Sequence, residues 1–428
     1  MDDAMAHQPN PEEAQQSRDQ TRRRGAPRPL AAHVLAAASD FQNGVSMAVA
    51  ADDPRFPWRP SLRERGSALA AAMRAQGAQA ARAAVAQEAL ADLGSALDGM
   101  AAYQAAPPLR RPAEPEVVWR SGAARLLDYS AADADEDAPP VVVLPSLVNG
   151  PWILDLSRAR SFLRGLAARG VRPFLLHWGD PGRLERRFSL ADYVEQRASP
   201  ALDQVARLTG ASRFGVIGHC MSGALSAATA QRRPDRVARL CLLAAPWDFG
   251  PLRPPEAARP GRRELAQLID ACAAVFGGVP SDILNTLFFL RDPLQAVRKF
   301  PSYAQKGRNS ALGRRFVAVE DWLGAGPRLA GPAARTLFID WSLDDALTSG
   351  RWRVGGARFD PRAVTAPTLV VASTVDTVAP FDSVAAAAEA LPNAQLLKPR
   401  GGHVGMIVGR DAETELWDPI AAFFRDAA

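Results

Sequence analysis

The pattern of hydrophobic and polar residues changes near residue 140. Upstream, residues 61–102 are rich in alanine, leucine, glutamine and arginine and contain few β-branched residues, which favours helix. Downstream, short apolar runs alternate with longer amphipathic stretches. Strands that alternate with helices in this way predict a doubly wound, mostly parallel α/β sheet.

The expected strands are short and apolar, and they lie at residues 141–144, 172–178, 214–218, 240–245, 368–373 and 394–398. Helices are expected over residues 156–169 and about 190–208, with Gly170 closing the first of them. Between about residues 250 and 361 the alternation stops, and the sequence is helical with frequent proline and glycine. We interpret this interval as a helical cap inserted over the sheet.

These patterns divide the chain into three expected regions. Residues 1–27 are polar and arginine-rich near their end, and we expect them to be disordered. Residues 28–115 should form a helical N-terminal extension, and residues 116–428 the α/β catalytic domain with its cap at about 250–361. The acidic stretch 131–137 is expected to be a surface loop before the first predicted strand.

Composition limits the classes of function that the chain can have. Its 428 residues are 47% hydrophobic and 23% charged, as is usual for a soluble globular protein. The net charge of +5 comes from scattered arginines without an aromatic-interleaved stripe, which argues against nucleic-acid binding. No apolar run reaches the roughly 20 residues that a membrane span needs. The N-terminus lacks a basic segment followed by an apolar one, so no signal peptide is predicted.

The three cysteines, Cys220, Cys241 and Cys272, are an odd and sparse set that fits a reducing compartment better than a disulfide scaffold. We therefore expect a cytoplasmic protein. Cys220 differs from the other two in its surroundings, because it follows the strand that ends at Gly218 and precedes an alanine-rich helix that opens at Ser222.

This surrounding of Cys220 is the strand–turn–helix context of a nucleophile elbow, with cysteine in place of the more usual serine. Small residues at Gly218 and Ser222 let the strand and the helix approach closely. The helix dipole then favours a thiolate at the helix N-terminus. A buried structural cysteine is the alternative, and it becomes the weaker interpretation once a base and an acid are found further along the chain.

A cysteine nucleophile needs a base and an acid, which in α/β-hydrolases follow it in the order acid, then histidine. Among the five histidines only His403 comes after Cys220, in a glycine-flanked loop behind the last predicted strand. Asp376 follows the strand at 368–373 and is the predicted acid. Asp382, expected to be the N-cap of the next helix, is the alternative acid. The predicted triad is therefore Cys220, Asp376 and His403.

An oxyanion hole needs two backbone N–H groups aimed at the charge that develops on the substrate oxygen. Met221, directly after the nucleophile, should supply one of them. The loop at residues 145–149 should supply the other, at Leu147 or Val148. His219 precedes the nucleophile and could face the sheet or the pocket, and we do not expect it to be the base. No metal site and no cofactor site is predicted.

Several segments resemble polyhydroxyalkanoate synthases, and the likeness runs from about residue 141 to the C-terminus. The segments that carry it are residues 145–156, 160–162, 176–181, the cysteine elbow, residues 316–322 and the loops around Asp376 and His403. The short N-terminal section makes the chain look most like the small, class III catalytic subunits. Three positions depart from the family pattern: Ser222 with Gly223 where two glycines are usual, Thr377 where histidine follows the acid, and His177 before Trp178.

The resemblance implies an α/β-hydrolase fold and an acyltransferase that polymerises (R)-3-hydroxyacyl-CoA thioesters with release of CoA. Cys220 would hold the growing chain as a thioester, His403 would deprotonate the thiol, and Asp376 would help to activate the 3-hydroxyl group. The partners that it implies are the acyl-CoA substrate, an activating synthase subunit, the surface of polyester granules and a second copy of the chain. It implies no cofactor.

Two other classes of function remain open. A cysteine hydrolase that cleaves an acyl-CoA thioester or a polyester would use the same triad, because only the exclusion of water separates the two reactions. A non-catalytic protein of the granule surface is the third hypothesis, and an intact triad argues against it. Apolar positions at helical spacing over residues 284–297 are expected to pack the cap on the core; a gate or a docking surface is the alternative.

Overall fold

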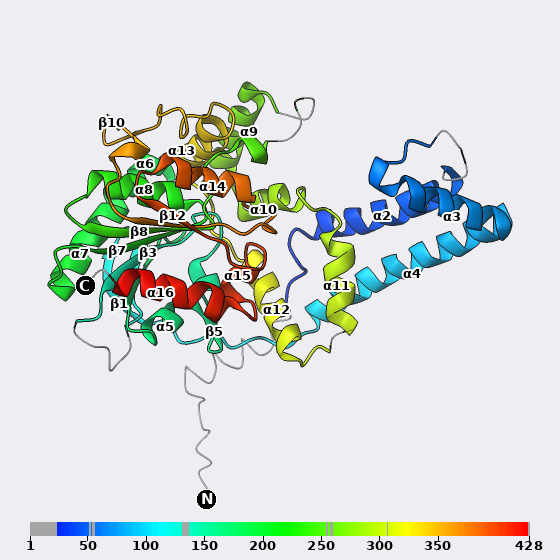
Figure 1. Ribbon diagram of the computed structural model, residues 1–428, viewed down its shortest axis with the longest axis horizontal. Coiled ribbons are helices and arrows are strands. Elements are labelled where there is room, and N and C mark those ends of the chain that lie inside the picture. The colour runs from blue at the N-terminus through cyan, green and yellow to red at the C-terminus, as the bar shows by residue number, and fades with distance from the viewer. Residues whose placement is uncertain are drawn as a thin grey trace, which may run out of the picture. The chain divides into compact units, whose positions relative to one another are not determined.

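The computed structural model describes residues 24–50, 53, 56–130, 137–253, 256, 260–305 and 307–426 (Figure 1). Most of the segment predicted to be disordered and most of the predicted acidic loop lie outside these residues. The chain divides into two compact units. The first contains the described residues up to Arg110 together with Asn285–Gly324, and the second contains Arg111–Leu284 and the chain from Ala325 onward.

The second unit is built on an eight-stranded sheet with the order β1-β2-β6-β3-β7-β8-β11-β12. Its strands are β1 (Glu116–Ser121), β2 (Ala124–Asp128), β3 (Pro140–Leu144), β6 (Arg172–His177), β7 (Phe214–His219), β8 (Val237–Leu243), β11 (Thr368–Val371) and β12 (Ala394–Leu397). All pairings from β6 to β12 are parallel, whereas β2 pairs antiparallel with both β1 and β6. The predicted doubly wound, mostly parallel sheet is confirmed.

Helices cover both faces of this sheet, which explains why its central strands are apolar along their whole length. Figure 1 shows α8 and α14 on one face and α5 and α16 on the other. The helices of this unit are α5 (Phe162–Ala167), α6 (Leu190–Tyr193), α7 (Ser199–Thr209), α8 (Ser222–Arg232), α9 (Arg262–Phe276), α13 (Gly331–Arg335), α14 (Phe381–Ala390), α15 (Gly405–Val408) and α16 (Asp418–Arg425). Single π-helical segments at Val194–Ala198, Thr336–Trp341 and Glu413–Trp417 adjoin α6, α13 and α16.

The prediction of a helix over residues 156–169 is wrong at its start. Residues Asp155–Ser157 and Arg160–Ser161 form a small antiparallel pair, β4 and β5, and the helix α5 begins only at Phe162. Ser161 caps it, because its hydroxyl accepts the N–H of Arg164 at 3.1 Å. A second small pair, β9 (Arg353–Val354) and β10 (Ala357–Arg358), lies in the segment predicted to be a cap.

The first unit is helical, with α2 (Leu30–Ala50), α3 (Arg63–Ala75), α4 (Ala78–Gln104), α11 (Gln295–Gln305) and α12 (Ala311–Leu323). Gly77, with φ of 85°, separates α3 from α4 within the predicted helical stretch. α4 and α11 approach closely at Gly99, where a Cβ would lie 2.3 Å from the carbonyl oxygen of Phe300. Residues 285–324, which lie inside the segment predicted to be a cap, thus belong to the unit of the N-terminal helices.

The apolar stretch at residues 284–297 is divided between α10 (Ser281–Phe289) and the start of α11. Phe289 is buried in the core of the first unit, whereas Leu287, Leu290 and Leu294 are exposed. Packing therefore accounts for only part of this stretch. No helix within the described ranges is both long and apolar enough to cross a membrane.

The fit between β7 and α16 leads to a stability prediction. A Cβ at Gly215 would lie 2.4 Å from the Phe424 ring, so Gly215→Ala should lower the free energy of unfolding by about 1–3 kcal/mol through overpacking. The matched control is Gly405→Ala, where a Cβ would meet no atom within 4 Å, and the change should stay within about 0.5 kcal/mol. Urea unfolding of both variants measures this. Equal stability of the two would contradict the close approach of β7 and α16.

Candidate active site

Cys220 lies at a sharp turn between the last residue of β7 and the first residue of α8. Its φ of 54° falls in the left-handed region that residues other than glycine seldom adopt. The turn is possible because its neighbours are small: a Cβ at Gly218 would lie 2.1 Å from Ser226 Oγ, and one at Gly223 would lie 2.2 Å from Ala245 Cβ. The backbone around Cys220 is therefore that of a nucleophile elbow.

The loop behind β3 is tied to this elbow through one carbonyl group. Pro145 O accepts a hydrogen bond from Ser222 Oγ at 2.5 Å and another from Trp178 Nε1 at 2.7 Å. Ser222 and Trp178 are both buried, so neither bond competes with water. Glycine, which is usual here in the family that the chain resembles, has no side chain to donate this bond, so the bond accounts for serine at position 222.

The other polar residues of the motif at 176–181 also have structural partners. His177 Nδ1 accepts the N–H of Gly179 at 3.0 Å. Asp180 Oδ1 accepts two hydrogen bonds from Arg328, one from its backbone N–H at 3.0 Å and one from its side-chain Nε–H at 3.1 Å. These bonds hold the loop after β6 against the segment that returns from α12 to α13, within the second unit.

Asp376 and His403 come from the loops after β11 and β12, and they meet side chain to side chain. His403 Nδ1 lies 2.8 Å from Asp376 Oδ2. The second carboxylate oxygen, Oδ1, accepts the N–H groups of Val378 at 2.8 Å and Ala379 at 2.9 Å. Both oxygens of Asp376 are thus used, which fixes the carboxylate and directs it at His403.

The electrostatics of His403 follow from this arrangement. Burial on its own would lower the pKa of His403, but the charges of the Asp376 carboxylate and the Cys220 sulfur raise the pKa to about 10. His403 therefore holds its proton as an imidazolium at neutral pH. Only 9% of Cys220, 6% of Asp376 and 8% of His403 is exposed, so all three side chains lie away from bulk water.

The alternative acid, Asp382, does not take part in this contact. It lies exposed in the first turn of α14, whose N-cap is Pro380, so the expectation that Asp382 caps the helix is wrong. For the predicted oxyanion hole, Met221 stands directly before the first residue of α8. The N–H of Val148 donates to Ser146 Oγ at 3.2 Å, which directs it at its own loop. Both oxyanion assignments stay predictions.

One residue at the site has a role that the sequence did not suggest. The ring of His219 stacks on the ring of His403, with 5.9 Å between the centroids and 28° between the planes. Its place directly before Cys220 was the only signal in the sequence. The contact itself joins residues on different strands and loops, which a local pattern does not reveal.

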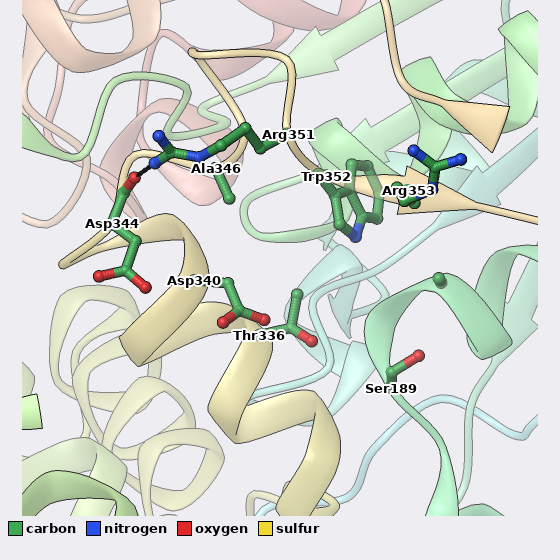
Figure 2. A pocket seen from close by; sticks show the side chains of 9 residues that line it. Ser189, Thr336, Asp340, Asp344, Ala346, Arg351, Trp352 and Arg353 are labelled. Atoms are coloured by element: carbon green, nitrogen blue, oxygen red, sulfur yellow. Dashed lines mark hydrogen bonds between the residues drawn. The ribbon is translucent and has the colours of Figure 1, made fainter. Parts of the chain in front are cut away.

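A separate cavity of about 690 Å³ lies in the second unit (Figure 2). Its walls carry both signs of charge, and they are formed by Ser189, Ala191, Thr336, Asp340, Asp344, Ala346, Arg351, Trp352 and Arg353. None of the three predicted catalytic residues lines it, so this cavity is not the predicted site. Across the described ranges, no three His, Cys, Asp or Glu side chains gather as they would around a metal ion.

Comparisons with known proteins support the fold and the resemblance. The model of the α/β-hydrolase fold family matches residues 139–409. The chain is 27% identical to a poly(3-hydroxyalkanoate) polymerase subunit PhaC of Haloferax mediterranei, over 73% of this chain and 63% of that protein. It is 26% identical to the subunit of the same name from Allochromatium vinosum, over 69% of this chain and 84% of that one.

Among solved structures, the chain matches an α/β-hydrolase fold protein from Nakamurella multipartita. It is 19% identical, with a TM-score of 0.44, over 72% of this chain and 99% of that chain.

The raised pKa of His403 can be tested by titration. Its imidazolium should persist to about pH 10, so its contribution to stability is complete below about 6.5 and is lost as the pH rises through 10. Asp376→Asn removes a charge that raises this pKa while burial remains, so the pKa should fall. NMR of the His403 ring protons, assigned with His403→Gln, measures both values. A wild-type His403 ring that titrates near pH 6.5 would contradict the raised pKa of this residue.

Proposed function

Because the chain belongs to the α/β-hydrolase fold family, we propose that it is a polyhydroxyalkanoate synthase-like acyltransferase. It would polymerise (R)-3-hydroxyacyl groups from CoA thioesters and release CoA through a covalent thioester on Cys220. The observation that carries this proposal is the cysteine at the elbow, in a chain similar to polymerase subunits PhaC. The matched region spans 63% of the Haloferax subunit and 84% of the Allochromatium subunit.

In the first step, the Cys220 thiolate attacks the carbonyl carbon of the acyl-CoA thioester. The bond between that carbon and the CoA sulfur breaks, and CoA leaves with the proton that His403 holds. The acyl group is now a thioester of Cys220, and His403 is neutral. The charge that develops on the carbonyl oxygen would be stabilised by backbone N–H groups at the elbow and the loop after β3.

In the second step, the 3-hydroxyl group of another acyl unit attacks the Cys220 thioester. Neutral His403 accepts the hydroxyl proton, an ester bond forms, and Cys220 leaves as a thiolate. Asp376 orients His403 through Nδ1 and stabilises the imidazolium that forms. The thiolate and the imidazolium with which the first step began are thereby restored.

Cysteine suits this reaction because exchange between two thioesters is nearly thermoneutral, so the acyl group stays activated for transfer to a hydroxyl. Water competes with that hydroxyl, and hydrolysis would end the polymer chain. The burial of Cys220, Asp376 and His403 supports transfer over hydrolysis. The proposal includes the partners that the resemblance implies, an activating subunit and the surface of the polymer granule.

The assay for this function uses purified protein with (R)-3-hydroxybutyryl-CoA, following free CoA by thiol titration and analysing the acyl product. We expect CoA release with polymer formation. Cys220→Ala should lower the rate of CoA release by at least about 10³-fold, because it removes the nucleophile. The matched control is Cys241→Ala, a buried cysteine of β8, which should keep the wild-type rate within about threefold.

Two results would argue against the proposal. CoA release with free 3-hydroxy acid as the sole product would make the protein a cysteine hydrolase. CoA release that survives Cys220→Ala would remove the nucleophile assignment altogether.

A further inference from the structure

His219 is a buried polar residue whose ring nitrogens the protein itself does not use. It is the last residue of β7 and only 2% exposed. Neither Nδ1 nor Nε2 has a hydrogen-bond partner among the described residues. Leaving a buried polar group unpaired costs about 1–3 kcal/mol, which an apolar side chain would avoid. With its nitrogens unused, the contact that His219 can offer its neighbours is the face of its ring.

The direction of the His219 side chain follows from its strand. Side chains alternate between the two faces of a sheet. A Cβ at Gly218 would meet Ser226 of α8, and one at Gly215 would meet Phe424 of α16. His219 shares the parity of Gly215, so it lies on the face opposite α8. On that side its ring meets the ring of His403.

The two stacked imidazoles carry different charges. Burial and the charge of His403 lower the pKa of His219 to about 3, so its ring is neutral at physiological pH. His403 is an imidazolium under the same conditions. A cation is attracted to the face of a neutral aromatic ring, whereas two cations at this distance would repel each other.

Hydrogen bonds hold His403 at its edge, one between Nδ1 and Asp376 and one with the Cys220 side chain. A ring held only at its edge can still turn about the line that joins these two contacts. A second ring packed against its face removes this freedom, so the edge contacts and the face contact together define the plane of His403. The remaining nitrogen, Nε2, then keeps one direction through the proton transfers.

We propose that His219 is a positioning residue for His403, whose imidazole it holds in plane by stacking. This inference rests on the proposed function only in that His403 serves Cys220 as its base. It assigns the positioning of the His403 ring to the aromatic face of His219 and gives the nitrogens of His219 no part in it.

The test compares His219→Leu with His219→Phe. Both variants fill the space with an apolar side chain and remove the nitrogens, but only phenylalanine keeps an aromatic face. We expect His219→Leu to lower kcat for CoA release about 10- to 100-fold with KM within about twofold, since a misplaced base slows the chemical step. His219→Phe should stay within about threefold of wild type. Both should melt at or above the wild-type temperature, because the unpaired nitrogens are gone.

A second readout needs no substrate. The rate at which iodoacetamide alkylates Cys220 is measured against pH, with His403→Ala as the reference for a lost base and Cys220→Ala as the blank. His219→Leu should shift the profile toward that of His403→Ala, with a loss of about tenfold at pH 7, while His219→Phe should keep the wild-type profile.

Each outcome decides between the interpretations. A wild-type alkylation profile in His219→Leu overturns the proposal. A profile in His219→Phe as impaired as in His403→Ala also overturns it, because the nitrogens would then be needed. If His219→Leu is unstable, the alkylation profile of His219→Phe still tests whether the nitrogens of His219 are needed. If none of the proteins releases CoA, the polymerase function fails while the alkylation profiles still test the role of His219.

Discussion

The left-handed backbone of Cys220 is the constraint on which the rest of the site depends. A residue with a side chain is held at φ of 54° only because the chain around it leaves room and supplies compensating contacts. Gly218 and Gly223 let β7, α8 and the chain after β8 approach so closely that a Cβ at either glycine would clash. Ser222 then bonds the carbonyl of Pro145, so the same turn also fixes the loop behind β3. The nucleophile and the predicted oxyanion loop are thus positioned by one piece of packing.

The site also has to stabilise a buried charge, the imidazolium of His403, and it does so by pairing this charge with a carboxylate. An isolated imidazolium would be unstable in so dry a place. Asp376 compensates it from one edge, and the carboxylate is itself saturated by Val378 and Ala379. The neutral ring of His219 adds a contact that brings no competing charge. In the proposed mechanism, the proton that leaves with CoA is therefore already on His403 before substrate arrives.

Local signals in the sequence were enough for the parallel strands of the sheet and for the residues around Cys220. Apolar runs that end at small residues predicted the parallel strands, and the order of the loops after them predicted Asp376 and His403. The hairpin of β1 and β2 was missed because Glu116, Arg120 and Arg125 interrupt its apolar pattern and its pairing partner lies far along the chain. The grouping of residues 285–324 with the N-terminal helices depends on packing at Phe300, and the stacking of His219 depends on a distant loop. A local sequence pattern predicts neither this grouping nor this stacking.

The central claim is that Cys220 carries the acyl group, and mass spectrometry of the intact protein tests it most directly. After brief exposure to (R)-3-hydroxybutyryl-CoA and an acid quench, we expect adducts that differ by successive 3-hydroxybutyryl units. Proteolysis should map them to the peptide of Cys220, and hydroxylamine should remove them, as it does thioesters. Release of CoA with the acyl group on another residue, or with no adduct at any time during turnover, would contradict the account.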